Sequence, residues 1–339
     1  MKRSELILPV LIMMLMITSC SNDDDGNARV KTSEIAHLYA TSHNGDVNRY
    51  DINTGVVTKY ANSSSDSEGI FYSSSEDAFT IVSRSSNRLE AYEGISALGD
   101  GGTKNPETYI FGGEDLENPV DLAVSGDFYV VSDNTDLDGD ETTPEGRLYI
   151  YIKTANNFIL RNVVQTKFKV WGIEFVGNDL FLAVDETNKL AVYRNFLNSN
   201  MMNRIVTADK IVAIQGLVRS HGLDYDNGTM VLSDIGEPES SSDGGLHIIQ
   251  DFDEKFSGTT NGGFIVSDDQ LRIAGGNTLL GNPVNVVYDS NYNVIFVAEA
   301  LNNNGRILAF NDATSVSGNI APDLKYALQG ASSIFFYTE

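Results

Sequence analysis

The sequence has few of the residues that signal cross-links or binding to polyanions. Cys20 is its single cysteine, so no intramolecular disulfide can form. Lys and Arg number 23 against 47 Asp and Glu, which gives a formal charge of −24. Such a surface repels phosphate backbones, which disfavours nucleic acid and favours cations as partners. The alternative is that the acidity serves solubility alone.

Signature motifs of common enzyme classes are also missing. The chain contains no GxSxG, no HExxH, no Walker loop and no GxGxxG. Its four histidines do not cluster by spacing. No nucleophile constellation can therefore be assigned from motifs.

One long apolar run is present, at the N-terminus. Residues 1–19 join a basic start to LILPVLIMMLMI, which is too short and too early for a spanning helix and predicts a secretory leader. The segment ITSC ending at Cys20 resembles the lipobox of bacterial lipoproteins, which implies lipidation of Cys20 and a membrane anchor. Acyl chains on that residue would hold the protein to a membrane.

The stretch 20–33 that follows is polar and acidic, and we expect a flexible tether there. An acidic run directly after a lipidated cysteine resembles the sorting signal that sends some lipoproteins of Gram-negative bacteria to the outside of the outer membrane. This predicts an outer-membrane lipoprotein exposed at the cell surface. An ordinary spacer is the alternative.

A strand-turn-strand-turn-strand phrase recurs through the rest of the chain. Trp171 to Arg194 (WGIEFVGNDLFLAVDETNKLAVYR) is a complete copy. Its first part recurs as GIFYS, PVDLAV, GLDYD, PVNVVYD and ASSIFFY. Repeats of about forty to sixty residues built only from strands and turns indicate propeller blades. Six copies predict an all-β, six-bladed β-propeller over residues 34–339.

The ends of the chain indicate how the ring closes. The last first-strand phrase, from Ala331, has no second or third part, while the phrases at Leu38 and Gly45 have no first part. Joined, they make one blade. Pairing of the N-terminal and C-terminal strands in one blade would remove two exposed sheet edges.

Antiparallel topology predicts where functional residues gather. First strands start, and second strands end, at the same end of each blade. The first-strand starts there are Glu68, Asn118, Trp171, His221, Asn282 and Gly330. The second-strand ends are His43, Arg84, Asp133, Asp185, Asp234 and Glu299. We predict that Trp171 and this second set contact a ligand, since loops on rigid scaffolds carry recognition.

Two phrases carry a family resemblance. HGLDYDNGTMVLSD and NPVNVVYDSNYNVIFVAEALNNNGRILAF resemble the NHL-repeat and gluconolactonase-like (SMP-30 type, TolB-like) six-bladed propellers. The resemblance implies a divalent metal at the channel mouth. Glu68 and Asn118 fit its ligand pattern, Asn282 is compatible, and His221 stands where Asn or Asp is usual. His221 and Glu68 are then the candidate catalytic residues of a metal-dependent lactonase or arylesterase.

A second candidate metal site lies in the segment 133–145. Counted from Asn134, oxygen-bearing side chains recur with the spacing of an EF-hand loop, with Gly139 at the sixth position. The predicted ligands of Ca²⁺ or another divalent cation are Asn134, Asp136, Asp138, Asp140 and Glu145. A solvated acidic loop is the alternative.

These patterns favour a binding propeller over an enzyme. We expect a cation-stabilised module that recognises a glycan, a peptide or an envelope protein through its acidic face. The alternatives are the metal-dependent hydrolase described above and a purely structural subunit.

Overall fold

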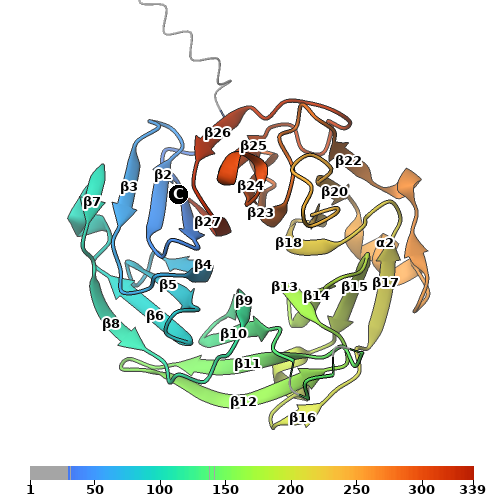
Figure 1. The fold of residues 1–339 in the computed structure, drawn as a ribbon, viewed down its shortest axis with the longest axis horizontal. Coiled ribbons are helices and arrows are strands. Elements are labelled where there is room, and N and C mark those ends of the chain that lie inside the picture. The colour runs from blue at the N-terminus through green and yellow to red at the C-terminus, as the bar shows by residue number, and fades with distance from the viewer. Residues whose placement is uncertain (1–29, 31, 137, 141) are drawn as a thin grey trace, which may run out of the picture.

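The computed structural model describes residues 30, 32–136, 138–140 and 142–339. The predicted leader and Cys20 lie outside the described residues, as does most of the predicted tether. The strands form six sheets that surround a central axis (Figure 1). The prediction of an all-β, six-bladed propeller is therefore confirmed.

Each blade begins with the strand nearest the axis and proceeds outwards. Blade 1 contains β27 (Ala331–Thr338), β1 (Ala36–Ser42), β2 (Val47–Asp51), β3 (Val57–Tyr60) and β7 (Gly102–Lys104). Blade 2 contains β4 (Ser67–Ser73), β5 (Ala78–Ser83), β6 (Arg88–Glu93) and β8 (Glu107–Phe111). Blade 3 contains β9 (Pro119–Ser125), β10 (Phe128–Asp133), β11 (Gly146–Lys153), β12 (Phe158–Thr166) and β16 (Arg204–Ile205).

The second half of the ring follows the same plan. Blade 4 contains β13 (Val170–Val176), β14 (Asp179–Val184), β15 (Lys189–Tyr193), β17 (Lys210–Ile214) and β21 (Phe264–Ile265). Blade 5 contains β18 (Ser220–Asp226), β19 (Thr229–Asp234), β20 (Gly245–Ile249) and β22 (Leu271–Ala274). Blade 6 contains β23 (Pro283–Asp289), β24 (Val294–Glu299), β25 (Arg306–Phe310) and β26 (Leu324–Ala327).

Each blade thus has a fourth strand beyond the three that the repeat predicted. Blades 1, 3 and 4 also have a fifth, because β7, β16 and β21 each come from the following blade and pair in parallel. These short strands cover the outer edge of a neighbouring sheet. A covered edge offers no free backbone donors and acceptors to another chain.

The ring closes as the sequence predicted. β27 pairs antiparallel with β1 in the register Leu38↔Phe336 and Ala40↔Ile334.

Tight turns fix the register between the inner strands of a blade. The Asn227-Gly228 turn between β18 and β19, for example, has positive φ at both residues, 46° and 83°. Two such residues make the turn whose twist matches that of the flanking strands.

The hydrophobic core is divided into six layers, one between each pair of neighbouring blades. Between blades 6 and 1, for example, Leu38 and Ile334 pack in the same cluster as Phe296 and Ile307. The other five interfaces are filled in the same way. Because every layer needs residues from two sheets, the blades stabilise one another.

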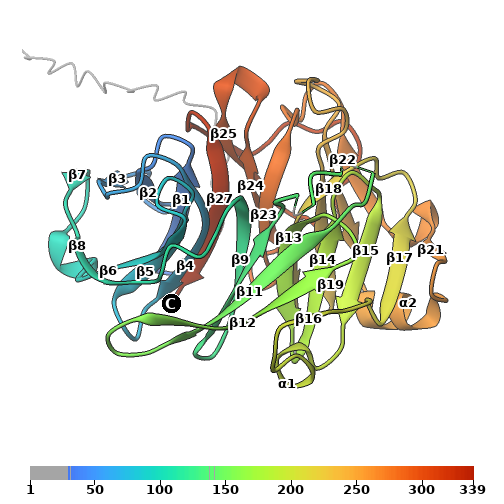
Figure 2. The same cartoon turned by 60° about the horizontal axis from the view of Figure 1, so that its bottom comes forward.

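Helices are few and short in the described part of the chain. They are α1 (Phe196–Ser199), α2 (Phe252–Gly258) and the single turns Ser96–Leu98, Ser267–Asp269 and Asn302–Asn304. Among the described residues, no helix has the length and apolar character needed to cross a bilayer. Figure 2 shows α1 at the side of the ring where β27 ends.

Candidate functional site

The register places the predicted residues on one face of the ring, here called the upper face. In every blade the start of the first strand pairs with the end of the second, as in Pro119↔Asp133 and Ser220↔Asp234. The corresponding pairs in the other blades follow the same rule. The face opposite, where α1 lies, is called the lower face.

Three of the second-strand acids on the upper face are buried and bound to the main chain. Asp133 Oδ2 accepts hydrogen bonds from the N–H groups of Glu117 and Asn118, each at 2.9 Å. Asp234 Oδ1 accepts from Val218 and Arg219 at 3.1 and 3.0 Å. In each case the donors belong to the segment that leads into the first strand of the same blade.

Glu299 is the third member and makes the largest set of bonds. Its carboxylate accepts from the N–H groups of Gly281, Asn282, Leu301 and Asn302 at 2.8 to 3.0 Å. Asp133, Asp234 and Glu299 are each 0% exposed. Burial leaves these three carboxylates little access to a ligand, and most of their oxygens accept hydrogen bonds from neighbouring loops, although Asp234 Oδ2 has no hydrogen-bond partner among the described residues.

Arg84 occupies the space between two of the predicted metal ligands. Its Nη1 donates to Glu68 Oε1 at 3.1 Å, and its Nη2 donates to Asn118 Oδ1 at 2.5 Å. His43 Nδ1 lies 2.7 Å from Asp66 Oδ1, and His43 Nε2 lies 3.6 Å from Glu68 Oε1. Burial raises the pKa of Glu68 to about 8, while the Arg84 guanidinium favours its ionised form.

This arrangement is unfavourable for the predicted channel-mouth metal. A guanidinium already donates to Glu68 and Asn118, and its charge would repel a divalent cation placed between them. A metal bound there would have to displace Arg84. Arg84 instead forms an ion-pair cluster with Glu68 and Asp66, and His43 lies beside both carboxylates.

His221 lies in a different group. Its ring stacks on Trp171 with centroids 3.8 Å apart and planes 8° apart. His221 Nε2 lies 3.3 Å from Asp185 Oδ1, although neither ring nitrogen makes a well-aligned hydrogen bond among the described residues. Burial lowers the pKa of His221, and the nearby Asp185 carboxylate opposes that shift. Trp171 therefore packs against a buried imidazole and is half-buried at the rim.

Asp185 differs from the other second-strand acids. It accepts from Arg219 Nε at 3.0 Å and from Asn134 Nδ2 at 3.3 Å, rather than binding the segment before its own first strand. Burial opposes ionisation, but His221 and Arg219 lower the pKa of Asp185. This carboxylate joins side chains from blades 3, 4 and 5.

Asn282, the last predicted metal ligand, belongs to the loop held by Glu299. Its side-chain Nδ2 donates to the Pro238 carbonyl at 3.4 Å, and its Oδ1 is buried without a described partner. The four predicted ligands thus fall into three groups by partner: Arg84 binds both Glu68 and Asn118, Asp185 lies beside His221, and the Pro238 carbonyl accepts from Asn282.

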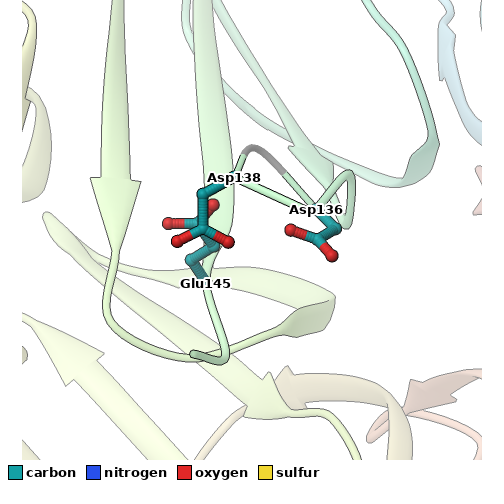
Figure 3. A group of neighbouring side chains, drawn as sticks. All are labelled: Asp136, Asp138 and Glu145. Atoms are coloured by element: carbon teal, nitrogen blue, oxygen red, sulfur yellow. The ribbon is translucent and has the colours of Figure 1, made fainter. Parts of the chain in front are cut away.

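Three of the five predicted loop ligands converge. Ligand atoms of Asp136, Asp138 and Glu145 lie within 4.8 Å of one another (Figure 3). Asn134 lies elsewhere, since its Oδ1 accepts from the Val170 N–H at 2.7 Å. Asp140 Oδ1 accepts from the Thr142 hydroxyl at 2.6 Å. The loop therefore does not wind as an EF-hand loop does, because Asn134 is drawn towards blade 4.

The inner strands carry a second set of acids. Asp121 Oδ2 accepts from the Ile173 N–H at 2.9 Å, and Asp224 Oδ2 accepts from the Tyr288 N–H at 2.6 Å. Each bond crosses to the inner strand of the next blade. Burial raises the pKa values of Asp121 and Asp224 to about 7. Burial, followed by the charges of Asp224 and Asp121, raises the pKa of Glu174.

The sequence analysis did not identify Asp66 and Arg219 as partners of the predicted site residues. It also did not predict that Arg84 pairs with Glu68 and Asn118. Asp66 and Arg219 each precede a predicted site residue by two positions, Glu68 and His221 respectively. That spacing along a strand places side chains on the same face, and it is the signal that could have found them.

Comparisons with known proteins support the fold. No family profile and no curated protein sequence matches the chain. A functionally unknown protein from Desulfotomaculum acetoxidans is similar in structure, with a TM-score of 0.56, 11% identity, and coverage of 89% of this chain and 98% of that one. A chain of the nidogen/laminin complex has a TM-score of 0.55 and 12% identity, with the same coverage.

A candidate 6-phosphogluconolactonase from Bacteroides fragilis is also similar. Its TM-score is 0.55, its identity is 11%, and the match covers 89% of this chain and 98% of that chain. Identities this low establish a shared propeller fold and nothing about a shared reaction.

The inner acids make stability depend on pH. Their folded-state pKa values are raised, so the folded protein holds protons more tightly than the unfolded chain, and stability falls as pH rises from about 4 to about 7. Asp224→Asn keeps an acceptor for Tyr288 and removes the charge. We expect it to raise Tm at pH 8 by a few degrees, and the gain to shrink towards pH 4.

Thermal unfolding followed by circular dichroism from pH 4 to 8 measures this. Asp323→Asn is the control, because Asp323 also accepts a main-chain N–H, from Asn311, but precedes the outer strand β26. Equal gains from the two variants at pH 8 would contradict the assignment.

Proposed function

We propose that the protein is a surface-anchored lipoprotein whose propeller is a binding module for a glycan, a peptide or an envelope protein. The upper face is the recognition surface. Its loops are fixed by the buried acids Asp133, Asp234 and Glu299, which reduces the entropy lost when a partner binds. His43, Trp171 and the long loops between second and third strands supply the accessible contacts.

One observation favours binding over metal-dependent hydrolysis: the guanidinium of Arg84 bound to both Glu68 and Asn118. The hydrolase alternative needs those two oxygens for a metal that would polarise a carbonyl or activate water. A relationship to NHL-repeat or gluconolactonase-like propellers fits the fold and is part of this proposal.

Turnover assays distinguish the two functions. With Ca²⁺, Mn²⁺ or Zn²⁺ supplied, we expect the wild type to show no metal-dependent hydrolysis of aldonolactones or aryl esters. Glu68→Gln should behave like the wild type. Glu107→Gln, which removes an exposed carboxylate from the outer strand β8, is the control. Metal-dependent turnover that is lost in Glu68→Gln and kept in Glu107→Gln would overturn the binding assignment.

The same proteins test recognition directly on panels of immobilised glycans and peptides. We expect Trp171→Ala and His43→Ala to reduce retention by about tenfold, since rim aromatics and polar groups supply contact energy. Retention unchanged in both variants would place recognition elsewhere.

Calcium is proposed to bind at Asp136, Asp138 and Glu145. Carboxylate oxygens suit a hard cation, and Gly139, with φ of 74°, lets the loop reverse between them. We expect millimolar Ca²⁺ to raise Tm and EDTA to lower it again. Asp136→Asn with Asp138→Asn should remove that rise, while the double control Asp268→Asn with Asp269→Asn keeps it. A rise that persists in the first double variant would refute this site.

Anchoring is proposed to depend on Cys20. In a Gram-negative host, wild-type protein should incorporate labelled palmitate, fractionate with the outer membrane and be cleaved by proteinase K added to intact cells. Cys20→Ala should lose the label and the membrane association. Label retained in Cys20→Ala would contradict the anchor, and protection from proteinase K in intact cells would contradict surface display.

A further inference from the structure

The lower face contains a hollow between blades 3 and 4 that the proposed function does not use. Its volume is about 340 Å³, within the range of roughly 300–1,000 Å³ typical of small-molecule sites. One wall is the β9–β10 turn with Phe128, and another is the segment after β15 with Leu197 and Met201. Phe175 and Arg161 also line it.

Local backbone chemistry shapes both walls. The β9–β10 turn is tight because Gly126 adopts φ of 58°. After β15 the chain turns through Asn195, with φ of 45°, and the fully buried Phe196 anchors the start of α1. Residues 204–205 then pair with β12 of blade 3. The segment 195–205, which forms one wall of the hollow, is therefore held in place at both ends.

Arg161 is the unusual member of this lining. Seven other described arginines form ion pairs with carboxylates: Arg49, Arg84, Arg88, Arg147, Arg194, Arg219 and Arg272. Arg161 has no ion pair among the described residues. The same holds for Arg204 and Arg306, but neither of these lines the hollow. Its Nε donates to Asn162 Oδ1 at 2.7 Å, and its Nη2 donates to the Asn200 carbonyl at 2.8 Å.

The guanidinium is thus held in place while part of its hydrogen-bonding capacity is unused. Of its five N–H donors, two make these bonds, which leaves three for a ligand. Its Cζ lies 5.1 Å from the centre of the Phe128 ring, which orients the group further. Burial lowers the pKa of Arg161, and no carboxylate offsets that cost. An oxyanion would offset it.

The rest of the lining favours an organic anion over an inorganic one. Phe128, Phe175, Leu197 and Met201 present carbon surface, and Met201 is 69% exposed. Three asparagines, at 178, 195 and 198, add amide groups. Asp127 is exposed in the same lining and makes no ion pair with Arg161, so a bound anion is expected to place its charge at the Arg161 end, away from Asp127.

We propose that this hollow binds a small carboxylate with an apolar body, the carboxylate on Arg161 and the apolar part against Phe128, Phe175 and Met201. A guanidinium fork pairs with a carboxylate through two parallel N–H bonds, and a half-buried setting strengthens them. Because the hollow is on the lower face, this site is independent of recognition at the upper face.

Isothermal titration calorimetry with phenylacetate tests the site on the wild-type protein. We expect saturable binding with a Kd of about 1 mM or tighter. Acetate lacks the apolar body and phenylacetamide lacks the charge, so each should bind at least about tenfold more weakly. Inorganic phosphate that displaces phenylacetate at equal concentration would overturn the preference for an organic carboxylate.

Two pairs of variants locate the binding. Arg161→Gln should weaken phenylacetate binding at least about tenfold. Arg204→Gln removes the same charge from an exposed arginine outside the hollow and should leave it unchanged. Equal binding by wild type and Arg161→Gln would refute the site.

The second pair does not depend on the fold surviving the loss of Arg161. Met201 and Met202 are adjacent and both 69% exposed, yet only Met201 is among the lining residues. Met201→Glu places a negative charge at the hollow and should weaken binding by about tenfold, whereas Met202→Glu should not. Equal affinities in these two variants would also refute the proposal, and unchanged melting temperatures confirm that both are folded.

Discussion

The structure depends on burial that is shared between sheets. A blade of four strands has two apolar faces and can cover neither by itself. Each of the six hydrophobic layers draws on two neighbouring blades, and the layer between blades 6 and 1 is completed by β27, which carries Ile334. The last strand of the chain is therefore needed by its first blade. Residues that are distant in sequence share a face because this ring is closed.

Burial in the closed ring also determines what several acidic residues of the upper face can contact. A chain with a charge of −24 invites the view that its upper face is a field of solvated carboxylates. Asp133, Asp234 and Glu299 are instead inside the protein. Each offsets the cost of desolvating a charge by accepting several main-chain hydrogen bonds, which also fixes the loop before an inner strand. Three acids of this face therefore hold loops in place, so fewer of its carboxylates face solvent than the composition suggests.

The fold could be predicted from the sequence because its strand phrases repeat. The outer strands could not be predicted in this way because their sequences do not repeat. The blade count, the closure and the shared face follow from phrases that recur, such as FYVVSD and LFLAVD, with a turn after each. The fourth strands differ in length and sequence, from the four-residue VTKY and LRIA to the nine-residue FILRNVVQT, so no common pattern exposes them. The outermost strand of blade 3 is supplied by residues 204–205 of the following segment. Such pairing depends on tertiary proximity, which strand periodicity does not encode.

The candidate sites were less predictable because they depend on which side chain reaches which partner. Spacing placed Asn134 first in a calcium loop, but the bond to the Val170 N–H draws it to blade 4. A resemblance placed Glu68 and Asn118 around a metal, but Arg84, sixteen residues beyond Glu68, reaches both. Neither outcome can be obtained from residue types alone, because each turns on a side-chain direction set by the neighbouring blade.

Arg84 and Arg161 show why the position of a cation matters more here than the number of anions. With twice as many acids as bases, an arginine is expected to find a carboxylate, and Arg84 finds Glu68. The carboxylate at the channel mouth is therefore neutralised by a side chain of the protein itself. Arg161 meets only neutral oxygens and an aromatic ring among the described residues, so its charge is still uncompensated inside a walled hollow. In a strongly acidic protein, we therefore expect an anion to bind where an arginine has no carboxylate partner within the protein, as in the hollow around Arg161.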